Sequence, residues 1–354
     1  MTDAPHRALW PAEWAPQAGV MLTWPRPDGD WGPVTPQAEQ SFAAIATVVS
    51  RRETCLIVAA DEPHVDRIRG VLIAAGTNLA SCRYAIAPSD DAWARDHGPI
   101  TVRLGDQLIL NDFRFDGWGG RHRCGQDDAI TAALHKSGAF GDIARRRCEL
   151  VVEGGAVETD GQGTLLATRS SVLPPCRNPD ASPNSVTDLL NDALGIERFL
   201  WLDHGELAGD DTDGHIDTLA RFTDARTIVH QSCDDPDDPN YPCLQAMRHQ
   251  LARFERPDGA RYRTVPLPTP NLVSADGAPL PAGYTNFLII NEAVLVPVYE
   301  HPSDTPALKR LAGCFPDREL IPIPCRALVR EGGSLHCVTM QIPAGVELAG
   351  ASFV

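Results

Sequence analysis

The chain has few of the features that mark membrane, secreted or nucleic-acid-binding proteins. No stretch approaches roughly eighteen consecutive apolar residues, which excludes a membrane-spanning helix. The N-terminus, Met1 to His6, has no basic region followed by an apolar run and does not resemble a signal peptide. Basic residues are also few, with 31 Lys and Arg against 47 Asp and Glu, and the net charge of -16 repels phosphate backbones. We therefore expect no membrane or nucleic-acid partner, whereas cationic small molecules would be attracted.

Metal-binding patterns are also scarce. The ten cysteines include no C-x-x-C pair and no cluster with zinc-ligand spacing. The acidic stretch 234–240 lacks the glycine and the distal glutamate of an EF-hand loop and is interpreted as a solvated loop. We expect reduced thiols, a cytoplasmic protein and no metal or other cofactor.

The residues that are present predict a mixed α/β fold. An apolar fraction of 43% is typical of a folded chain, and 29 glycines with 30 prolines favour many short elements over a helical bundle. Apolar side chains recur at helical spacing in four segments, 38–49, 65–75, 186–193 and 244–254. Ser185 with Asp188 resembles a capping box at the start of the third of these helices, and Gly195 would end it.

Strand-like segments are spread evenly along the chain. They are 53–60, 100–104, 107–115, 148–153, 164–169, 198–202, 216–222, 226–230, 285–298, 319–323 and 335–342. No proline- or serine-rich linker divides them, and no repeat is visible by residue identity. We expect residues 1–354 to form a single domain, although the length alone would suggest about two.

Four polar clusters lie at predicted strand ends or beside glycines, where a backbone can approach a ligand. They are Asp91–Pro99, Glu153–Gly155, Gly209–Asp217 and Gly332–Cys337. Cys337 follows a double glycine and a histidine within the strand-like run 335–342. A nucleophilic cysteine needs a lowered pKa and a proton-transfer partner, so this cluster alone leaves a buried structural thiol as an equal alternative.

The segment His215–Ile216–Asp217 provides candidate partners for such a cysteine. In a strand over 216–222, residues two apart project from the same face, so His215 and Asp217 would point into one site. An ordinary surface histidine is the alternative. A metal-dependent hydrolase is another, with candidate ligands at Asp210, Asp211, Asp213, His215 and Asp217. No second histidine motif completes such a site.

A cysteine, a histidine and a surplus of carboxylates together favour a cationic electrophile. Amide hydrolysis by cysteine and histidine needs one orienting group and an oxyanion hole rather than several carboxylates. A guanidinium is planar and permanently charged, and carboxylates accept its N–H groups in pairs. The chemistry predicted from these residues is therefore attack of a thiolate on a guanidinium carbon.

At the level of motifs, the chain resembles the agmatine deiminase and bacterial-type peptidylarginine deiminase family of guanidino-modifying enzymes. The resemblance rests on W-x-R-D-x-G-P, E-G-G, D-D-T-D-G-H-x-D and G-S-L-H-C-V-T-M-Q. Further similar segments follow in family order between about residues 10 and 343: Pro11–Trp14, Trp24–Pro25, Gly117–Gly120, Arg177–Pro179, Tyr284–Phe287 and Phe315–Arg318. The resemblance implies a five-bladed pseudo-symmetric α/β-propeller (pentein fold), built of ββαβ-type modules around a central active site.

The resemblance also implies roles for individual residues. Cys337 would be the nucleophile, and His215 would protonate the departing ammonia and then activate water. Asp96 and Asp217 would hold the guanidinium, and Glu153 would support His215. Three further substrate-binding residues are expected: Trp93 along the channel, Asp213 near a distant ammonium, and Asn286 in the site.

The expected function is that of an agmatine deiminase in arginine and polyamine (putrescine) metabolism. It would hydrolyse agmatine to N-carbamoylputrescine and ammonia through a covalent amidino-cysteine intermediate. Peptidylarginine or free-arginine deiminase remains the alternative within the family, because residues 336–341 and 111–115 differ from the usual agmatine deiminase pattern. A silent guanidino-binding protein is disfavoured, since Cys337 and His215 are both present. The only macromolecular partner that we consider is a second copy of the chain, which would form a homodimer.

Overall fold

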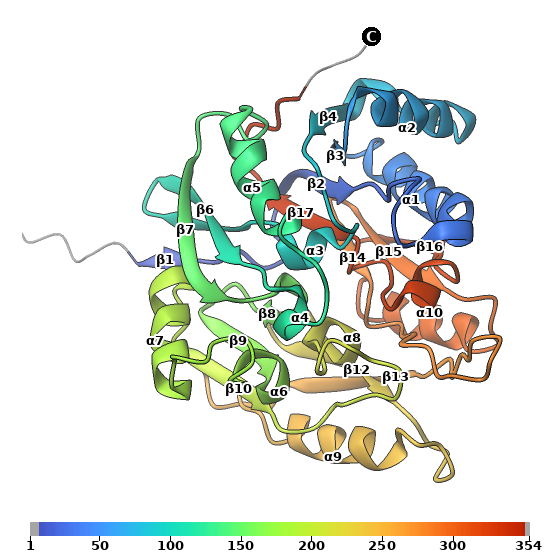
Figure 1. The fold of residues 1–354 in the computed structure, drawn as a ribbon. Helices are drawn as coiled ribbons and strands as arrows, with labels where there is room; N and C mark the ends of the chain where they lie inside the picture. Colours follow the sequence, from blue (N-terminus) through green and yellow to red (C-terminus); the bar gives the residue numbers. More distant parts are fainter. Residues whose placement is uncertain (1–6, 351–354) are drawn as a thin grey trace, which may run out of the picture.

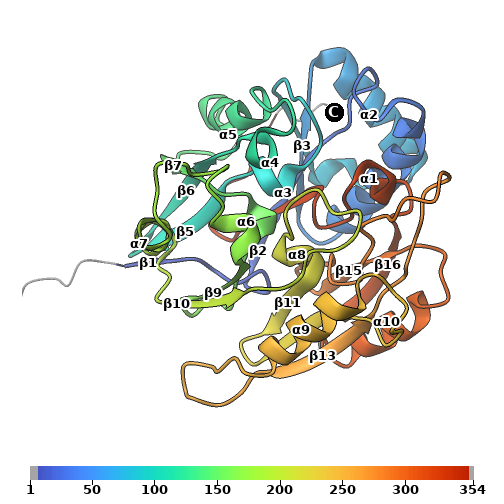
Figure 2. The same ribbon diagram turned by 60° about the horizontal axis from the view of Figure 1, so that its bottom comes forward.

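The computed structural model describes residues 7–350, and within them the strands form five separate small sheets. The strand orders are β1-β5-β6-β7, β10-β9-β8, β11-β12-β13, β14-β15-β16 and β17-β2-β3-β4. The sheets succeed one another around a common centre, with the longer helices on the outside (Figures 1 and 2).

Four of the sheets repeat one module, in which two antiparallel strands are followed by a helix and a third strand parallel to the second. The first module is β5 (Ile100–Leu104), β6 (Gln107–Arg114), α5 (Asp127–Lys136) and β7 (Ala144–Val151), with β1 (Ala8–Leu9) added beside β5. The second is β8 (Val157–Thr159), β9 (Thr164–Thr168), α7 (Pro183–Leu194) and β10 (Arg198–Leu202). The third is β11 (Ala220–Asp224), β12 (Thr227–Ser232), α9 (Tyr241–Leu251) and β13 (Arg263–Pro268). The fourth is β14 (Leu288–Ile290), β15 (Ala293–Val298), α10 (Asp304–Ala312) and β16 (Glu319–Pro324).

The fifth sheet joins the two ends of the chain. β17 (Thr339–Pro343) pairs antiparallel with β2 (Gln17–Thr23), in a register that sets Met340 opposite Met21. α1 (Thr35–Val49) then leads to β3 (Thr54–Ala59), and α2 (Glu62–Ala74) leads to β4 (Cys82–Ile86), both parallel additions. In Figure 1 the red β17 lies beside the blue β2. The predicted five-bladed α/β-propeller of ββαβ modules is confirmed.

Helix α7 shows how local sequence sets the boundaries of these elements. The Ser182 hydroxyl accepts a hydrogen bond from the Ser185 N–H, and Pro183 occupies the first turn, where its missing N–H costs nothing. The predicted start at Ser185 was therefore wrong. Gly195, with a φ of 71°, ends the helix as predicted, and Val186 and Leu190 bury one face against the second sheet.

Three predicted strands contain other structure. Residues Ile216–Leu219 form a one-turn helix, α8, and 335–338 form a turn, so β11 and β17 begin later than expected. The Thr218 hydroxyl donates to the His215 carbonyl, and the Thr339 hydroxyl donates to the carbonyls of Leu335 and His336. Such local bonds compete with a strand ladder. The predicted strand 285–298 is two antiparallel strands, β14 and β15, joined by a turn at Asn291 and Glu292.

A short turn precedes one strand of every sheet and lies near the centre of the ring. These turns are α3 (Ala94–His97) before β5, η3 (Gly154–Ala156) before β8, α8 before β11, residues 284–287 before β14, and residues 335–338 before β17. α3 and α8 both contact η3, and α3 contacts β17. The fold thus delivers one turn from each blade to a common point.

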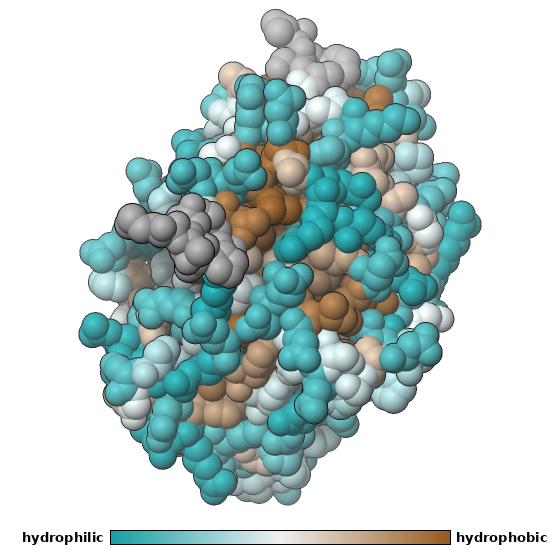
Figure 3. All heavy atoms as spheres, turned by 90° about the vertical axis from the view of Figure 1, so that its left-hand side faces the viewer, coloured by the Kyte–Doolittle hydropathy of each residue, from teal (hydrophilic) through white to brown (hydrophobic). Residues whose placement is uncertain are grey.

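The surface and the core are separated as in a typical folded protein. The core includes Trp24 and Phe42 between α1 and the fifth sheet, and these two side chains are at most 1% exposed. The face on the side of β1 and β7 is mostly polar, with an apolar strip near its middle (Figure 3). None of the helices within residues 7–350 has the length and apolar character needed to cross a membrane.

Candidate active site

The central turns bring the predicted site residues together. Asp96 lies on α3, Glu153 directly precedes η3, and His215 and Asp217 lie at the start of α8. Asn286 and Cys337 come from the turns before β14 and β17, and all six side chains are buried.

A cavity of about 60 Å³ opens onto this cluster. Its lining comprises Asp91, Trp93, Asp96, Trp118, His122, Asp211, Thr212, His215, Thr218, Glu331, Gly332, Gly333 and Cys337. Asp96, His215 and Cys337 therefore face it, whereas Asp217, Glu153 and Asn286 lie outside this lining. Asp211 and His122 are more than half exposed, and they mark the mouth of the cavity.

Cys337 is held in its turn by the backbone and by Asn286. Its carbonyl accepts from the Arg95 N–H at 3.1 Å, and the Asn286 Oδ1 accepts from the His336 N–H at 2.8 Å. The Asn286 Nδ2 lies 3.4 Å from the Cys337 Sγ, and Asp217 Oδ2 lies 4.0 Å from it. Burial and the negative charges of Asp217 and Asp96 raise the pKa of the Cys337 thiol well above its usual value. Cys337 in these surroundings is therefore a thiol, and a cation beside the sulfur would favour the thiolate.

His215 lies within reach of both candidate carboxylates. Its Nδ1 is 3.6 Å from Asp96 Oδ1, and burial lowers its pKa to about 3. The prediction that His215 and Asp217 share a strand face was wrong, because the helical turn α8 starts there. The turn nevertheless brings both side chains to Gly155. A Cβ on that glycine would lie 2.7 Å from His215 Nδ1, 2.8 Å from Asp96 Oδ1 and 3.1 Å from Asp217 Oδ2.

The two candidate guanidinium-binding carboxylates have different surroundings. Asp96 accepts from the Trp118 Nε1 and from the Gly155 N–H, each at 3.0 Å. Burial and the neighbouring Asp217 raise the pKa of Asp96 well above its usual value. Asp217 Oδ2 accepts from the His336 Nδ1 at 2.8 Å, which lowers the Asp217 pKa against the opposing effect of burial. Within residues 7–350, Asp217 Oδ1 is buried and has no hydrogen-bond partner.

Glu153 and Asp213 have partners that the sequence did not predict. Glu153 accepts from the Arg177 Nε at 2.7 Å, and the described contacts include none between Glu153 and His215. Arg177 also donates to Asp213 at 2.7 Å, and Arg121 donates to both oxygens of Asp213. Asp213, which was expected to lie near a substrate ammonium, thus forms ion pairs with two guanidiniums of this chain.

Trp93 forms one wall of the cavity. Its Nε1 donates to Asp91 at 2.8 Å, and its ring centre lies 5.4 Å from that of Trp31. A Cβ on Gly333 would lie 2.3 Å from the Trp93 ring, so this glycine lets the backbone pack against the indole. Gly333, in the double glycine before Cys337, is therefore needed for the packing of Trp93.

The alternative metal ligands do not converge. Asp210 accepts from the Thr212 hydroxyl and the Gly214 N–H, each at 2.7 Å, while Asp213 faces arginines. Within residues 7–350, no group of three or more His, Cys, Asp or Glu side chains is arranged to hold a metal ion. The segment 210–217 thus folds on itself through side-chain-to-backbone bonds.

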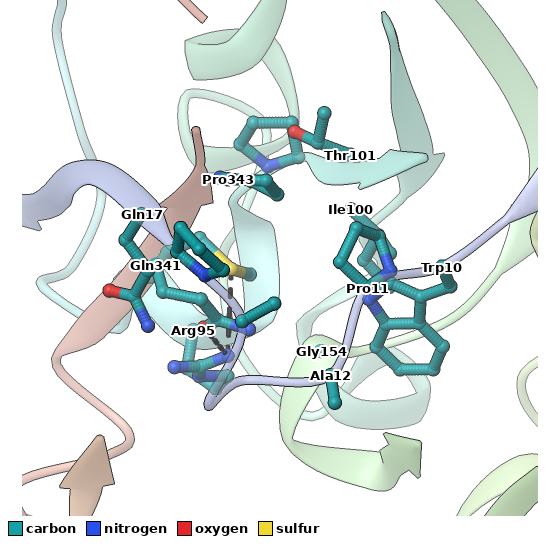
Figure 4. Close-up of a pocket in the computed structure, with 14 residues that line it drawn as sticks. Trp10, Pro11, Ala12, Gln17, Arg95, Ile100, Thr101, Gly154, Gln341 and Pro343 are labelled. Atoms are coloured by element: carbon teal, nitrogen blue, oxygen red, sulfur yellow. Dashed lines mark hydrogen bonds between the residues drawn. The ribbon is translucent and has the colours of Figure 1, made fainter. Parts of the chain in front are cut away.

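Arg95 supports the site from behind. Its Nη1 donates to Gln341 at 2.6 Å and approaches the Met340 sulfur, as the dashed lines in Figure 4 show. The small cavity beside it is lined by residues such as Trp10, Gln17 and Thr101, with no cysteine, histidine or carboxylate. This second cavity lacks the groups for the predicted chemistry.

Several supporting residues escaped the sequence reasoning. Trp118 and Gly155 were seen only as parts of recognisable segments, although the structure sets both against Asp96. His336 was seen only as a neighbour of Cys337, and Glu13 only as part of an N-terminal motif, yet the two side chains contact each other at 2.8 Å. The spacing of residues along the sequence does not predict such contacts, because they join side chains from different blades.

Known proteins share the sequence pattern and the fold of this chain. The model of the Porphyromonas-type peptidyl-arginine deiminase family matches residues 9–343. The chain is 31% identical to an agmatine deiminase of Stutzerimonas stutzeri, over 94% of this chain and 95% of that protein. A solved Porphyromonas gingivalis protein, described as a putative arginine deiminase, is 46% identical with a TM-score of 0.90, covering 96% of this chain and 99% of that one. A substrate-bound agmatine deiminase variant of C. jejuni is 29% identical with a TM-score of 0.88, covering 96% and 97%.

Proposed function

The chain belongs to the Porphyromonas-type peptidyl-arginine deiminase family, and from that premise we propose that it hydrolyses agmatine to N-carbamoylputrescine and ammonia. It is a hydrolase acting on C–N bonds of linear amidines. The observation that carries the choice of substrate is the charge of the cavity. Asp96 lies beside Cys337 at its base, Asp211 and Glu331 line it farther out, and no lining residue within 7–350 is Lys or Arg.

These charges match a substrate with a cation at each end. The guanidinium end would meet Asp96 and the unpartnered Asp217 Oδ1 beside the sulfur. The ammonium end would meet Asp211 and Glu331 near the mouth. A free-arginine substrate carries a carboxylate, which would need a cationic partner that the lining lacks.

Thiolate formation is the first step. Negative neighbours disfavour the thiolate in the empty site, and a bound guanidinium offsets them. The thiol proton passes to neutral His215, and the sulfur bonds to the guanidinium carbon to give a neutral tetrahedral adduct. The Asn286 amide, 3.4 Å from the sulfur, donates to the thiolate.

His215 then transfers a proton in each of the two remaining steps, the loss of ammonia and the attack of water. It gives its proton to one nitrogen of the adduct, the C–N bond breaks, and ammonia leaves a positively charged amidino-thioether. Neutral His215 next takes a proton from water, and the hydroxide adds to the same carbon. The C–S bond breaks as the hydroxyl proton of the adduct passes to the sulfur, so the ureido product leaves and the thiol is restored. The proton that His215 still holds passes to solvent, where it converts the released ammonia to ammonium.

Glu153 and Trp93 assist without bonding to the reacting atoms. Glu153 fixes Arg177, and burial together with the positive charge of Arg177 keeps the pKa of His215 low and the imidazole neutral. The Trp93 ring flanks the flat guanidinium or the alkyl chain of the substrate. We assign these roles to the two residues as part of the proposal.

The same proposal extends to the setting of the protein. N-carbamoylputrescine is one hydrolysis away from putrescine, which links the activity to arginine and polyamine metabolism. All ten cysteines are free, which supports a reducing compartment such as the cytoplasm. Since five sheets contribute turns to one site, residues 1–354 act as one catalytic domain.

A second candidate is deimination of arginine, free or within a peptide. The higher identity to the P. gingivalis protein favours it, at 46% against 31% for the S. stutzeri agmatine deiminase. Ammonia release from agmatine, free arginine and a blocked arginyl peptide, measured side by side without added metal, separates the candidates. Agmatine turnover at least a hundredfold above the others supports the proposal, and preference for either arginine substrate rejects it.

A further inference from the structure

The buried side chain of His336 connects Asp217 to a second carboxylate beneath the site. Its Nδ1 lies 2.8 Å from Asp217 Oδ2, and its Nε2 lies 2.8 Å from Glu13 Oε2. All three side chains are at most 4% exposed. We infer that His336, anchored by Glu13, is a positioning residue that fixes Asp217 for guanidinium binding, an inference that rests on the proposed function.

The two contacts define how many protons the three groups share. A ring nitrogen without hydrogen would set a lone pair against a carboxylate at 2.8 Å, which is repulsive. The two contacts at 2.8 Å therefore place two protons between Asp217, His336 and Glu13, and the two carboxylates hold the second proton on the ring against the burial and the arginines that lower the His336 pKa. The bond at Asp217 occupies Oδ2 only, and it leaves Oδ1 as the acceptor with no partner in residues 7–350.

Glu13 is itself held by charged groups from other blades. Arg221, on β11, donates to Glu13 Oε2 at 2.9 Å, and the Ile289 N–H donates to Oε1 at 2.7 Å. Arg95, on α3, lies 3.7 Å from the same carboxylate, and Arg221 also pairs with Glu158 on β8. Arg221 and Arg95 lower the pKa of Glu13, so it remains an ionised acceptor for His336.

The groups around His336 shift the pKa of its imidazole in opposite directions. Burial, Arg221 and Arg95 lower its pKa, and Glu13 together with the bond to Asp217 opposes them. The backbone N–H of His336 donates to the Asn286 Oδ1, which anchors the same residue in the Cys337 turn. His336 thus contacts two parts of the site: its backbone lies in the Cys337 turn, and its ring bonds to the Asp217 carboxylate.

A double-mutant cycle with Asp217 tests the inference. We expect His336→Gln to lower kcat/KM for agmatine by about 10- to 100-fold, because Asp217 loses its fixed orientation. In an Asp217→Asn background the same change should cost less than about threefold, since the carboxylate to be positioned is gone. Losses that multiply across the two sites would overturn the inference, as would a folded His336→Gln protein within threefold of the parent.

A substrate-independent measurement keeps this test separate from that of the proposed function. We expect cationic 2-chloroacetamidine and neutral iodoacetamide both to alkylate Cys337, and the ratio of their rates at this residue would report the carboxylates around the sulfur. His336→Gln should reduce this ratio about tenfold, and again only slightly in the Asp217→Asn background. A parent protein that releases no ammonia from agmatine rejects the proposed substrate, whereas an unchanged ratio rejects the role of His336.

Two further variants guard against a purely structural effect. Glu13→Gln keeps the shape of the anchor and removes its charge, and it should shift both readouts in the same direction as His336→Gln. His230→Gln changes another buried histidine, on β12, whose ring bonds only a backbone carbonyl among the described contacts. It should lower the melting temperature without changing the alkylation ratio. Equal ratios in the His336 and His230 variants would contradict the inference.

Discussion

Gly155→Ala is the most direct test of how the turns assemble the site. The added methyl would lie 2.7 Å from His215 Nδ1 and 2.8 Å from Asp96 Oδ1, whereas ordinary contacts begin at 3.4 Å. Relief therefore requires a displacement of about 0.6–0.7 Å in groups that must meet the substrate. A misplacement of about 1 Å can cost about a hundredfold in rate, so we expect kcat to fall by between ten- and a hundredfold.

The stability of the same variant should change much less than its activity. Gly155 has no positive φ, so alanine adds no backbone strain, and overpacking in a buried site costs about 1–3 kcal/mol. Gly70→Ala, in α2 with no atom within 4 Å of its added methyl, is the matched control and should be stabilised slightly. Ammonia release and urea unfolding measure the two effects. A Gly155→Ala protein with kcat within threefold of the parent would refute the packing argument.

Four other predictions test separate parts of the molecule. Cys337→Ala should abolish ammonia release while calorimetry still detects agmatine binding, and residual turnover within tenfold of the parent contradicts covalent catalysis. Trp118→Phe removes the bond to Asp96 at 3.0 Å and should lower kcat/KM about tenfold, since bonds to charged groups contribute about 1.5–3 kcal/mol; unchanged steady-state kinetics would reject it. Burial lowers the pKa of both His97 and His215 from 6.5 to about 3, so the unfolded chain binds more protons between these values. The contribution of these two histidines to stability is full above pH 6.5 and falls as the pH drops toward 3. The change in urea midpoint between pH 7 and pH 5 should therefore differ between the parent and His97→Leu, with the variant losing less at low pH, and equal changes in the two proteins would contradict this. Ser182→Ala should cost about 1 kcal/mol in urea unfolding through loss of the α7 cap, and no change there would exclude the cap.

The sequence predicted the fold class and the cluster of site residues through motifs, but it could not predict how those residues meet. His215 and Asp217 were expected to converge by strand alternation, and they converge through a helical turn instead. The partners of Glu153 and Asp213 are arginines from distant segments, and no local pattern encodes such pairs. Local periodicity predicts elements, whereas contacts between blades depend on the closed ring.

The seam between β17 and β2 has a consequence for how activity arises and is lost. Cys337 directly precedes β17, and Met340 pairs with Met21 across almost the whole length of the chain. In the finished protein, local opening of this one seam detaches Cys337 while the remaining sheets stay paired. Activity thus depends on the pairing of two strands that lie near opposite ends of the sequence.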